Sequence, residues 1–261
     1  MSGEIVHLDI AGGVGTITLD SPSNRNALSR QLTSELWGHL QAALADERVR
    51  VIVLTGSGTV FCSGADLKEQ REANVAGNAA AGPVGLPQIL TAMWESPKPV
   101  IGRINGAARA GGLGLVAACD IAVAVETATF ALSEVRIGVI PAVISVVLLP
   151  KLGVSKAMEL FIGGEPFSAA DAVGFGLINA TAPADGLDSA VGRYVTMIRK
   201  GAPGAIAGAK RLVRDVPRLP MAEAFAEMAR ISASFFATAE AREGMTAFAE
   251  KRPPKWAEGI E

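Results

Sequence analysis

Hydrophobic positions in the first fifty residues change from an alternating pattern to a helical one. Residues 5–10 and 14–19 are predicted to be two strands, and the Gly12-Gly13 pair between them favours a tight hairpin turn. A polar loop follows at residues 20–26. Four leucines at four-residue spacing then predict one face of a helix that begins near Ser29: Leu32, Leu36, Leu40 and Leu44.

Short apolar runs alternate with helical segments in the middle of the chain. Residues 49–54, 99–104 and 121–125 are each predicted to be a buried strand, with a helix over residues 111–118. Residues 73–87 show no pattern and are predicted to be a loop. This order of elements predicts a largely parallel α/β core.

The last hundred residues are predicted to be helical. Ser155 and Ser168 are candidate N-caps, and Gly174-Phe175-Gly176 is expected to stop the second of these helices. The final Ala-rich segment carries more apolar side chains at helical spacing than a peripheral helix needs, which indicates an assembly surface. These side chains are Phe225, Met228, Ile231 and Phe235.

Composition and charge exclude several classes of protein. The chain has 261 residues, 49% of them hydrophobic, and can therefore bury a sizeable core. Its 24 basic and 26 acidic side chains give a net charge of −2, which argues against a nucleic-acid partner. We expect an α/β core over residues 1–195 and a helical C-terminal region over residues 196–261.

Neither a membrane span nor a secretory signal is predicted. The longest nearly apolar stretch, residues 137–149, is interrupted by Pro141 and Ser145 and is too short to cross a bilayer. Cys62 and Cys119 lie far apart and form no CxxC pair, so we expect reduced thiols. Together these features predict a cytoplasmic protein that binds no membrane.

Chemistry based on histidine or on a metal has little support. His7 lies in a strand pattern and His39 on a predicted helix face, so both are expected to be structural or solvated. Residues 153–157 approximate a nucleophile elbow around Ser155, but both histidines precede it, which reverses the usual order. No His, Cys or Glu group has the spacing of zinc ligands, so no metal site is predicted.

A glycine motif in mid-chain resembles a dinucleotide-binding fingerprint. Residues 112–117 match GxGxxA, and Glu134 follows Gly114 by 20 residues. However, the motif comes after a hairpin and an α/β unit, and Glu134 does not end the strand that would pair next. A short glycine motif in a glycine-rich chain is weak support for this interpretation.

Two glycine-bearing turns, each followed by the start of a helix, form another candidate site. They lie at residues 61–67 and 105–112. Helix starts carry free N–H donors and a positive dipole end, so each turn can hold an oxyanion. Two converging donors would form an oxyanion hole, in which each contributes about 3 kcal/mol in the transition state. The residues alone do not distinguish such a site from two ordinary turns.

An ordered set of motifs closely resembles the crotonase (enoyl-CoA hydratase/isomerase) superfamily. The motifs run along nearly the whole chain, at residues 26–28, 63–67, 105–112, 119–121, 130–141, 167–172, 176–178 and 248–252. The resemblance implies an α/β spiral of ββα units with a helical C-terminal trimerisation region, in a homotrimer or homohexamer. It also implies that no metal or redox cofactor is used, because coenzyme A (CoA) arrives as part of an acyl-CoA substrate.

The resemblance also implies which residues meet the substrate. The N–H groups of Ala65 and Gly111 would bind the thioester oxygen and stabilise the enolate without a titrating side chain. The expected CoA contacts are Arg25, Ala27, Ala65, Asp66, Leu67, Gly112, Lys251 and Lys255. The two lysines would reach a phosphate, either in the same subunit or across a subunit boundary. Solvated charge is the alternative for them and for Arg25.

The acid–base residues depart from the hydratase pattern. Hydratases of the family hold one water between two glutamates; Glu134 matches the second, whereas Gly114 stands where the first should be. Isomerases of the superfamily retain only the second carboxylate, since one base can move a proton between carbons. Residues 130–145 are similar to methylglutaconyl-CoA hydratases, and Arg109 would pair with the second carboxylate of such a substrate or else be structural.

The predicted function is therefore hydration of a 2-enoyl-CoA, with Glu134 as the base that activates water; a branched or methylglutaconyl-type acyl group is one option for the substrate. The alternatives are a 3,2-enoyl-CoA isomerase with Glu134 as sole base, and a non-catalytic scaffold that binds CoA esters. A Gly114→Glu substitution is expected to raise hydration if the site admits the new side chain.

Overall fold

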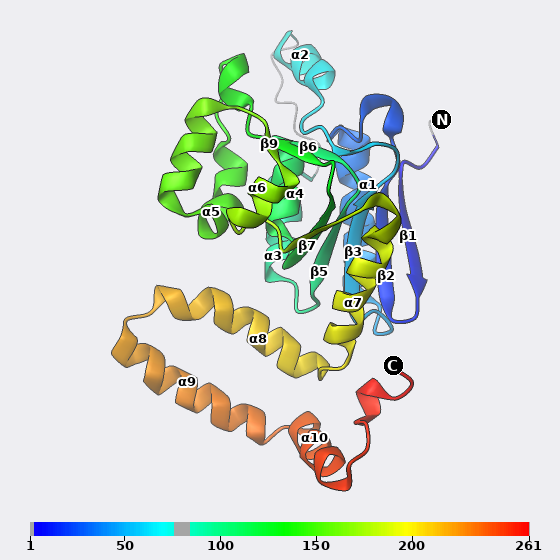
Figure 1. Ribbon diagram of the computed structural model, residues 1–261, viewed down its shortest axis with the longest axis vertical. Helices are drawn as coiled ribbons and strands as arrows, with labels where there is room; N and C mark the ends of the chain where they lie inside the picture. Colours follow the sequence, from blue (N-terminus) through cyan, green and yellow to red (C-terminus); the bar gives the residue numbers. More distant parts are fainter. Residues whose placement is uncertain (1–2, 76–83, 261) are drawn as a thin grey trace.

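The computed structural model describes residues 3–75 and 84–260, and two β-sheets form its centre (Figure 1). The larger sheet has the strand order β1-β2-β3-β5-β7-β10. Its strands are β1 (Val6–Ala11), β2 (Val14–Leu19), β3 (Val51–Gly56), β5 (Val100–Ile104), β7 (Ile121–Val125) and β10 (Ala180–Ala182). β1 and β2 form the predicted antiparallel hairpin, and the other neighbours are parallel.

The smaller sheet has the strand order β4-β6-β8-β9. Its strands are β4 (Val60–Cys62), β6 (Ala107–Arg109), β8 (Thr129–Ala131) and β9 (Phe167–Ser168). Consecutive strand pairs therefore place one strand in each sheet: β3 and β4, then β5 and β6, then β7 and β8. This repetition confirms the predicted spiral of ββα units.

Helices follow the strand pairs and surround the sheets (Figure 1). They are α1 (Arg30–Ala45), α2 (Leu67–Val75), α3 (Leu86–Glu95), α4 (Gly111–Ala118), α5 (Ala142–Gly163), α6 (Ala169–Gly174) and α7 (Leu187–Arg199). The predicted start of α1 is confirmed, because the Ser29 hydroxyl accepts the Leu32 N–H at 3.2 Å. Its leucine face packs into the core, with Leu36 and Leu40 both buried.

The three apolar runs predicted as strands are β3, β5 and β7. Every residue of β3 is buried, and so are four of the five residues of β7. Parallel strands that are covered on both faces have this continuous apolar character rather than an alternating one. The larger sheet therefore provides a rigid base from which the shorter strands and their loops project.

One predicted N-cap is confirmed and the other is wrong. Ser168 caps α6, since its hydroxyl accepts the Asp171 N–H at 3.1 Å. Ser155, in contrast, lies inside α5, which continues through Pro150. A kink at Gly153, with φ of 66°, separates the two parts of this helix and produces the local break that the sequence pattern suggested.

The predicted loop at residues 73–87 is too long at both ends. α2 continues to Val75, and α3 begins at Leu86. Residues 76–83 lie outside the described part of the chain. Among the described residues, no helix combines the length and the apolar character that crossing a membrane requires.

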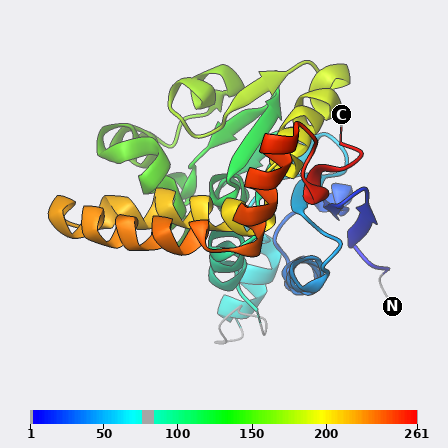
Figure 2. The ribbon, with the colours of Figure 1, turned by 90° about the horizontal axis from the view of Figure 1, so that it is seen from below.

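The C-terminal helices extend away from the sheets. They are α8 (Pro203–Asp215), α9 (Met221–Phe236) and α10 (Ala239–Glu250). Figures 1 and 2 show α8 and α9 as a long pair beside the core, with α10 following at its end. The expected start of this region, residue 196, falls inside α7, and the helices that leave the sheets begin at Pro203.

A buried ion cluster connects α8 to the core. Asp120, which precedes β7, accepts from Lys210 Nζ and from Arg214 Nη2, each at 2.7 Å. Asp120 also accepts the Val100 N–H at 2.8 Å, and the Arg214 guanidinium lies 4.3 Å from the centre of the Trp94 ring. Two cations that are desolvated beside one carboxylate fix the position of α8.

We expect Asp120→Ala to destabilise the protein by about 3–5 kcal/mol, because it leaves two buried cations without their counter-charge. Urea unfolding of the purified variant measures this loss. The control is Asp188→Ala, which removes a carboxylate that is 82% exposed and bonded to Arg103. The control should cost no more than about 1 kcal/mol. Equal losses in both variants would contradict the structural role of the cluster.

Candidate active site

Two strand-to-helix turns converge at one edge of the smaller sheet. β4 leads through residues 63–66 into α2, and β6 leads through Ala110 into α4. Because β4 and β6 are parallel neighbours, both turns lie at the same edge. The approach is close: a Cβ on Gly64 would lie 2.9 Å from both Ala110 Cβ and the Arg109 carbonyl oxygen. The predicted convergence of the two glycine turns is therefore present.

Each turn presents a backbone N–H that the fold leaves free. Gly111 is the first residue of α4, where an N–H has no partner within the helix. The Gly64 carbonyl accepts the Leu28 N–H at 2.8 Å, and in a trans peptide the following Ala65 N–H points the opposite way. Within residues 3–75 and 84–260, neither Ala65 nor Gly111 donates its N–H to an acceptor. Two unpartnered backbone donors on neighbouring turns are the arrangement that an oxyanion hole requires.

Both donors face a cleft with a volume of about 1080 Å³. Its polar lining lies mainly on α1 and α2 and includes Arg30, Asp66, Glu69 and Arg71. Its apolar lining comes from the segment that follows Glu134: Ile137, Val139, Ile140, Pro141, Val143 and Ile144. The cleft therefore has one charged side and one apolar side.

Glu134 is the carboxylate on the apolar side. It opens the short 3-10 helix η2 (Glu134–Ile137) shortly after β8, and the residue lines the cleft. Its Oε2 is buried and has no hydrogen-bond partner among the described residues. Burial raises the pKa of Glu134 above its ordinary value of 4.5. A partly desolvated carboxylate with a free oxygen has the properties of a general base.

The space beside Gly114 is already filled. A Cβ at Gly114 would lie 2.4 Å from Ile144 Cγ2, a separation that real Cβ atoms do not reach. The condition attached to Gly114→Glu, that the site admits the side chain, is therefore not met while Ile144 is present. Glu134 has no second carboxylate from this part of α4 to share its work.

Three of the predicted CoA contacts line the cleft. Ala65, Asp66 and Leu67 all line it, and the Leu67 side chain is 61% exposed. Asp66 also has a structural task, because its Oδ1 accepts the N–H groups of Lys68 and Glu69 at 3.0 and 3.2 Å. Asp66 therefore caps α2 and also lines the cleft.

Three other predicted contacts are not among the described residues that line the cleft. Gly112 is buried, and a Cβ there would meet the Cys62 carbonyl oxygen at 2.4 Å, so this glycine allows close backbone packing. Ala27 is also buried. Arg25 is exposed and left-handed, with φ of 59°, and its carbonyl accepts the Ser63 N–H at 3.1 Å.

Arg109 has structural partners and is not part of the described cleft lining. Its guanidinium donates to the Thr129 carbonyl and, at 2.7 Å, to Thr129 Oγ1. It also donates to the Ala108 carbonyl at 3.0 Å. The suggested contact between Arg109 and a substrate carboxylate does not fit this arrangement, because the side chain turns along the sheet toward β8. Of the two roles left open by the sequence, the structural one agrees with its contacts.

Lys251 and Lys255 lie at the far end of the molecule from the cleft. Both follow α10, whereas α2, which lines the cleft, is at the opposite end in Figure 1. Lys251 is left-handed, with φ of 54°, and terminates α10. Neither lysine is among the described residues that line the cleft, so their predicted contact with CoA is left to a neighbouring subunit.

The histidines and cysteines are engaged elsewhere. His7 Nε2 lies 3.1 Å from Asp20 and His39 Nε2 lies 2.9 Å from Glu4, both near the protein surface. Both thiols are free, and burial raises the pKa of Cys62 and that of Cys119 to about 12. None of these four residues lines the described cleft.

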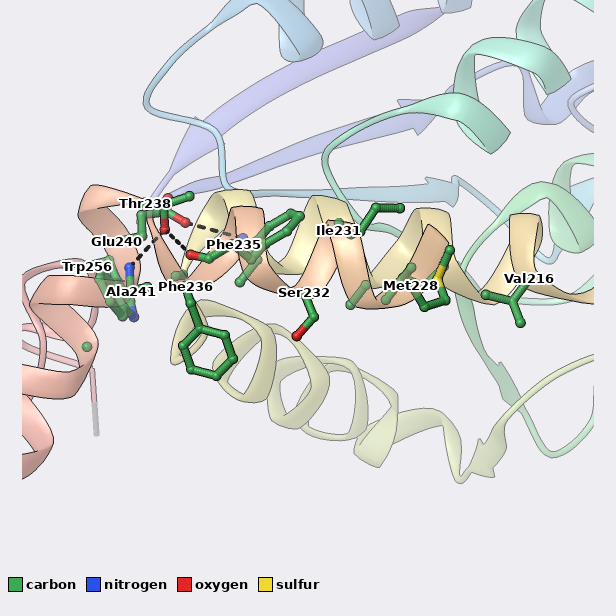
Figure 3. Close-up of a pocket in the computed structure, with 16 residues that line it drawn as sticks. Val216, Met228, Ile231, Ser232, Phe235, Phe236, Thr238, Glu240, Ala241 and Trp256 are labelled. Atoms are coloured by element: carbon green, nitrogen blue, oxygen red, sulfur yellow. Dashed lines mark hydrogen bonds between the residues drawn. The ribbon is translucent and has the colours of Figure 1, made fainter. Parts of the chain in front are cut away.

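A second cavity lies between the C-terminal helices and has a volume of about 640 Å³ (Figure 3). Its lining is largely apolar and includes three side chains predicted for the assembly surface: Met228, Ile231 and Phe235. The fourth, Phe225, is 73% exposed. Glu240 is its one acidic lining residue, and the N–H groups of Gly204 and Ala205 already donate to it. Its carboxylate is therefore already engaged, unlike the Glu134 oxygen in the cleft described first.

Sequence reasoning missed two cations and an apolar wall. Arg30 and Arg71 line the cleft from α1 and α2. Their position on helix faces looks like ordinary solvated charge, and the sequence contains no signal that separates them from such charge. The sequence also contains no signal for Ile144, because its position in the cleft depends on its contact with Gly114, 30 residues earlier.

Comparisons with known proteins agree with this fold over its full length. The profile of the enoyl-CoA hydratase/isomerase family matches residues 9–259. A "Probable enoyl-CoA hydratase" of Rhizobium meliloti is 36% identical over 258 residues, covering 97% of each chain. An enoyl-CoA hydratase structure from Mycobacterium smegmatis has 34% identity and a TM-score of 0.86, covering 97% of this chain and 98% of that one. Pseudomonas aeruginosa AtuE has 31% identity and a TM-score of 0.91, covering 98% and 100%.

The two-sheet spiral and the cleft with paired backbone donors and one buried carboxylate define an enzyme of the crotonase fold. The chain belongs to the enoyl-CoA hydratase/isomerase family. It is an enzyme of the enoyl-CoA hydratase type, as its relatives over the whole chain are.

The raised pKa of Glu134 has a consequence for stability. The folded state binds the carboxyl proton more tightly than the unfolded state. Above the raised pKa, ionisation of Glu134 therefore lowers the free energy of unfolding. Below the unfolded-state pKa, Glu134 is protonated in both states and this loss disappears. Glu134→Gln should therefore raise Tm near pH 7, and the difference from the parent should vanish in acid. Thermal unfolding at several pH values tests this, with the exposed Glu126→Gln as control. A Glu134→Gln variant that is less stable at pH 7 would contradict the burial argument.

Proposed function

We propose that this enzyme adds water across the 2,3 double bond of a 2-enoyl-CoA whose acyl group is apolar, with Glu134 as its single acid–base carboxylate. The observation that carries the proposal is the buried, partnerless Glu134 Oε2 on the same cleft as the Ala65 and Gly111 donors. Because Oε2 has no protein partner, a water molecule bound in the cleft would satisfy its hydrogen-bonding capacity.

The proposed mechanism uses both sets of groups. The Ala65 and Gly111 N–H groups bind the thioester oxygen and stabilise the enolate that forms when C3 is attacked. Glu134 accepts a proton from the attacking water, so that a C3–O bond forms while the C2–C3 π electrons move to the enolate. Glu134 then returns that proton to C2. Water addition is redox-neutral, so no redox cofactor is required and CoA enters as part of the substrate.

The charge distribution of the cleft supports an apolar acyl group rather than a glutaconyl one. Arg30 and Arg71 are the cations among the described lining residues, and both lie on the α1 and α2 side. The same side carries Asp66 and Glu69, and its two guanidinium groups are the ones that would pair with the phosphates of CoA. The side around Glu134 is apolar, and Arg109 is bonded to Thr129. A second substrate carboxylate there would be buried without a counter-charge.

Turnover of crotonyl-CoA tests the proposal directly. Hydration removes the conjugated double bond and lowers the enoyl absorbance, and the product is identified as the 3-hydroxyacyl ester by mass spectrometry. Binding of crotonyl-CoA without any product would contradict hydration and would favour a scaffold for CoA esters.

One observation favours a second candidate, the 3,2-enoyl-CoA isomerase. Ile144 occupies the space next to Gly114, so a single carboxylate serves the site, and one base suffices to move a proton between C4 and C2. A 3-enoyl-CoA ester separates the two reactions. An isomerase converts it to the 2-enoyl ester, whereas a hydratase leaves it unchanged.

We further propose that the chain works as a homotrimer or homohexamer. Apolar side chains on α9 and α10 are largely exposed, with Phe225 73%, Phe236 67% and Phe248 87% accessible to solvent. Several large apolar side chains exposed on two consecutive helices are typical of an interface. Light scattering at micromolar concentration should give three or six times the 26.8 kDa of one chain. A monomeric mass would contradict the proposal.

A further inference from the structure

Helix α4 has no room for a side chain one turn after the oxyanion donor Gly111. A Cβ on Gly114 would lie 2.4 Å from Ile144 Cγ2 and 3.1 Å from Ile144 Cβ. Leu90 Cδ1, from α3, would be 3.5 Å away. The Ile144 side chain therefore takes the volume that any residue other than glycine at position 114 would occupy.

Ile144 is held rigidly in this position. It lies in the first turn of α5 and is 3% exposed. A β-branched side chain in a helix has essentially one χ1 rotamer. With the α4 backbone against its Cγ2, it forms a fixed wall rather than a movable gate.

The same side chain lines the cleft that holds the polar groups of the reaction. Ile144 and Glu134 both line it, at the two ends of the segment that contains Pro141. Glu134 supplies the free oxygen, and Ile144 supplies methyl and methylene surface without a donor or acceptor. An alkene held by the Ala65 and Gly111 donors and within reach of Glu134 would share this cleft with Ile144.

We infer that Ile144 is the specificity-determining residue of this cleft: its side chain admits an unbranched enoyl chain and excludes a methyl branch at C3. The inference rests on the proposed acyl-CoA substrate. Exclusion or admission of one methylene-sized group by an apolar pocket changes selectivity by about 10–200-fold. Shortening Ile144 should remove most of that selectivity.

The test compares the parent with Ile144→Ala in binding and in turnover. Butyryl-CoA and 3-methylbutyryl-CoA are saturated, so calorimetry measures their affinity without reaction. The parent should bind butyryl-CoA at least about tenfold more tightly, and Ile144→Ala should reduce that ratio by at least about tenfold. The ratio of kcat/KM for crotonyl-CoA over 3-methylcrotonyl-CoA should fall in parallel. Val146→Ala, on the same helix and 73% exposed, should leave both ratios unchanged.

Two further variants keep the test informative if Ile144→Ala is unstable. Ile144→Val removes one methyl group and should shift the ratios in the same direction by a smaller factor. Gly114→Ala should lower Tm because its Cβ meets Ile144, and the double variant Gly114→Ala/Ile144→Ala should recover most of that loss.

Equal ester ratios in the parent and in the Ile144 variants would overturn the inference, as would a parent that binds both saturated esters equally. Shifted binding ratios without turnover of any enoyl ester would support the role of Ile144 and contradict the proposed hydration. Failure to bind any of these acyl-CoA esters would overturn both.

Discussion

The Glu134→Gln variant should fold and bind acyl-CoA esters but turn them over at least about 10²-fold more slowly than the parent. Gln keeps the size of the side chain and one acceptor oxygen, but it cannot take a proton from water. The effect should appear in kcat with little change in KM, because the Ala65 and Gly111 donors that bind the thioester are backbone groups.

The pH profile gives the same prediction a second measurement. The base must be ionised to accept a proton from water. Because burial raises the pKa of Glu134, kcat/KM of the parent should begin to fall on acidification at a pH above the ordinary pKa of a glutamate side chain. This limb should be absent from the residual activity of Glu134→Gln. The exposed Glu126→Gln variant should keep both the rate and the limb. Parent-like rates in Glu134→Gln on every ester would overturn the mechanism.

Elements with strong periodicity were predictable from the sequence. The hairpin, α1 and the buried strands β3, β5 and β7 each have enough residues for an alternating, helical or continuous apolar pattern. The smaller sheet was not predictable in this way, because its strands have only two or three residues. Such strands carry no period, and their pairing depends on contacts between distant parts of the chain.

The candidate site was likewise predictable only in part, because its geometry depends on contacts between distant residues. Glycine turns before helices suggested donors, but only the parallel pairing of β4 with β6 places Gly64 against Ala110. The sequence showed that position 114 has no carboxylate, yet the residue that occupies the space, Ile144, comes from another helix. The sequence left two roles open for Arg109, binding a substrate carboxylate or a structural contact. Its bonds to Thr129 depend on the register of β6 with β8, which the sequence does not show.

Gly64→Ala should separate the two donor turns and reduce kcat by about 10²–10³-fold, the loss expected when one oxyanion donor is misplaced. Two effects combine. Gly64 has φ of 88°, a conformation that alanine adopts only with strain. Its new methyl would also lie 2.9 Å from Ala110 Cβ and the Arg109 carbonyl oxygen, and 3.3 Å from the Gly111 nitrogen. Relief of these contacts moves either the Ala65 N–H or the Gly111 N–H away from the thioester oxygen.

Gly12→Ala is the matched control, because it has the same type of backbone strain without the contacts. Gly12 has φ of 53° in the hairpin turn, and a Cβ there meets nothing within 4 Å. Both variants should lose about 1–2 kcal/mol of stability from the left-handed backbone. Only Gly64→Ala should lose turnover, when equal amounts of protein shown to be folded by circular dichroism are assayed. If Gly64→Ala retained parental kcat, the converging turns would not be the site that stabilises the enolate.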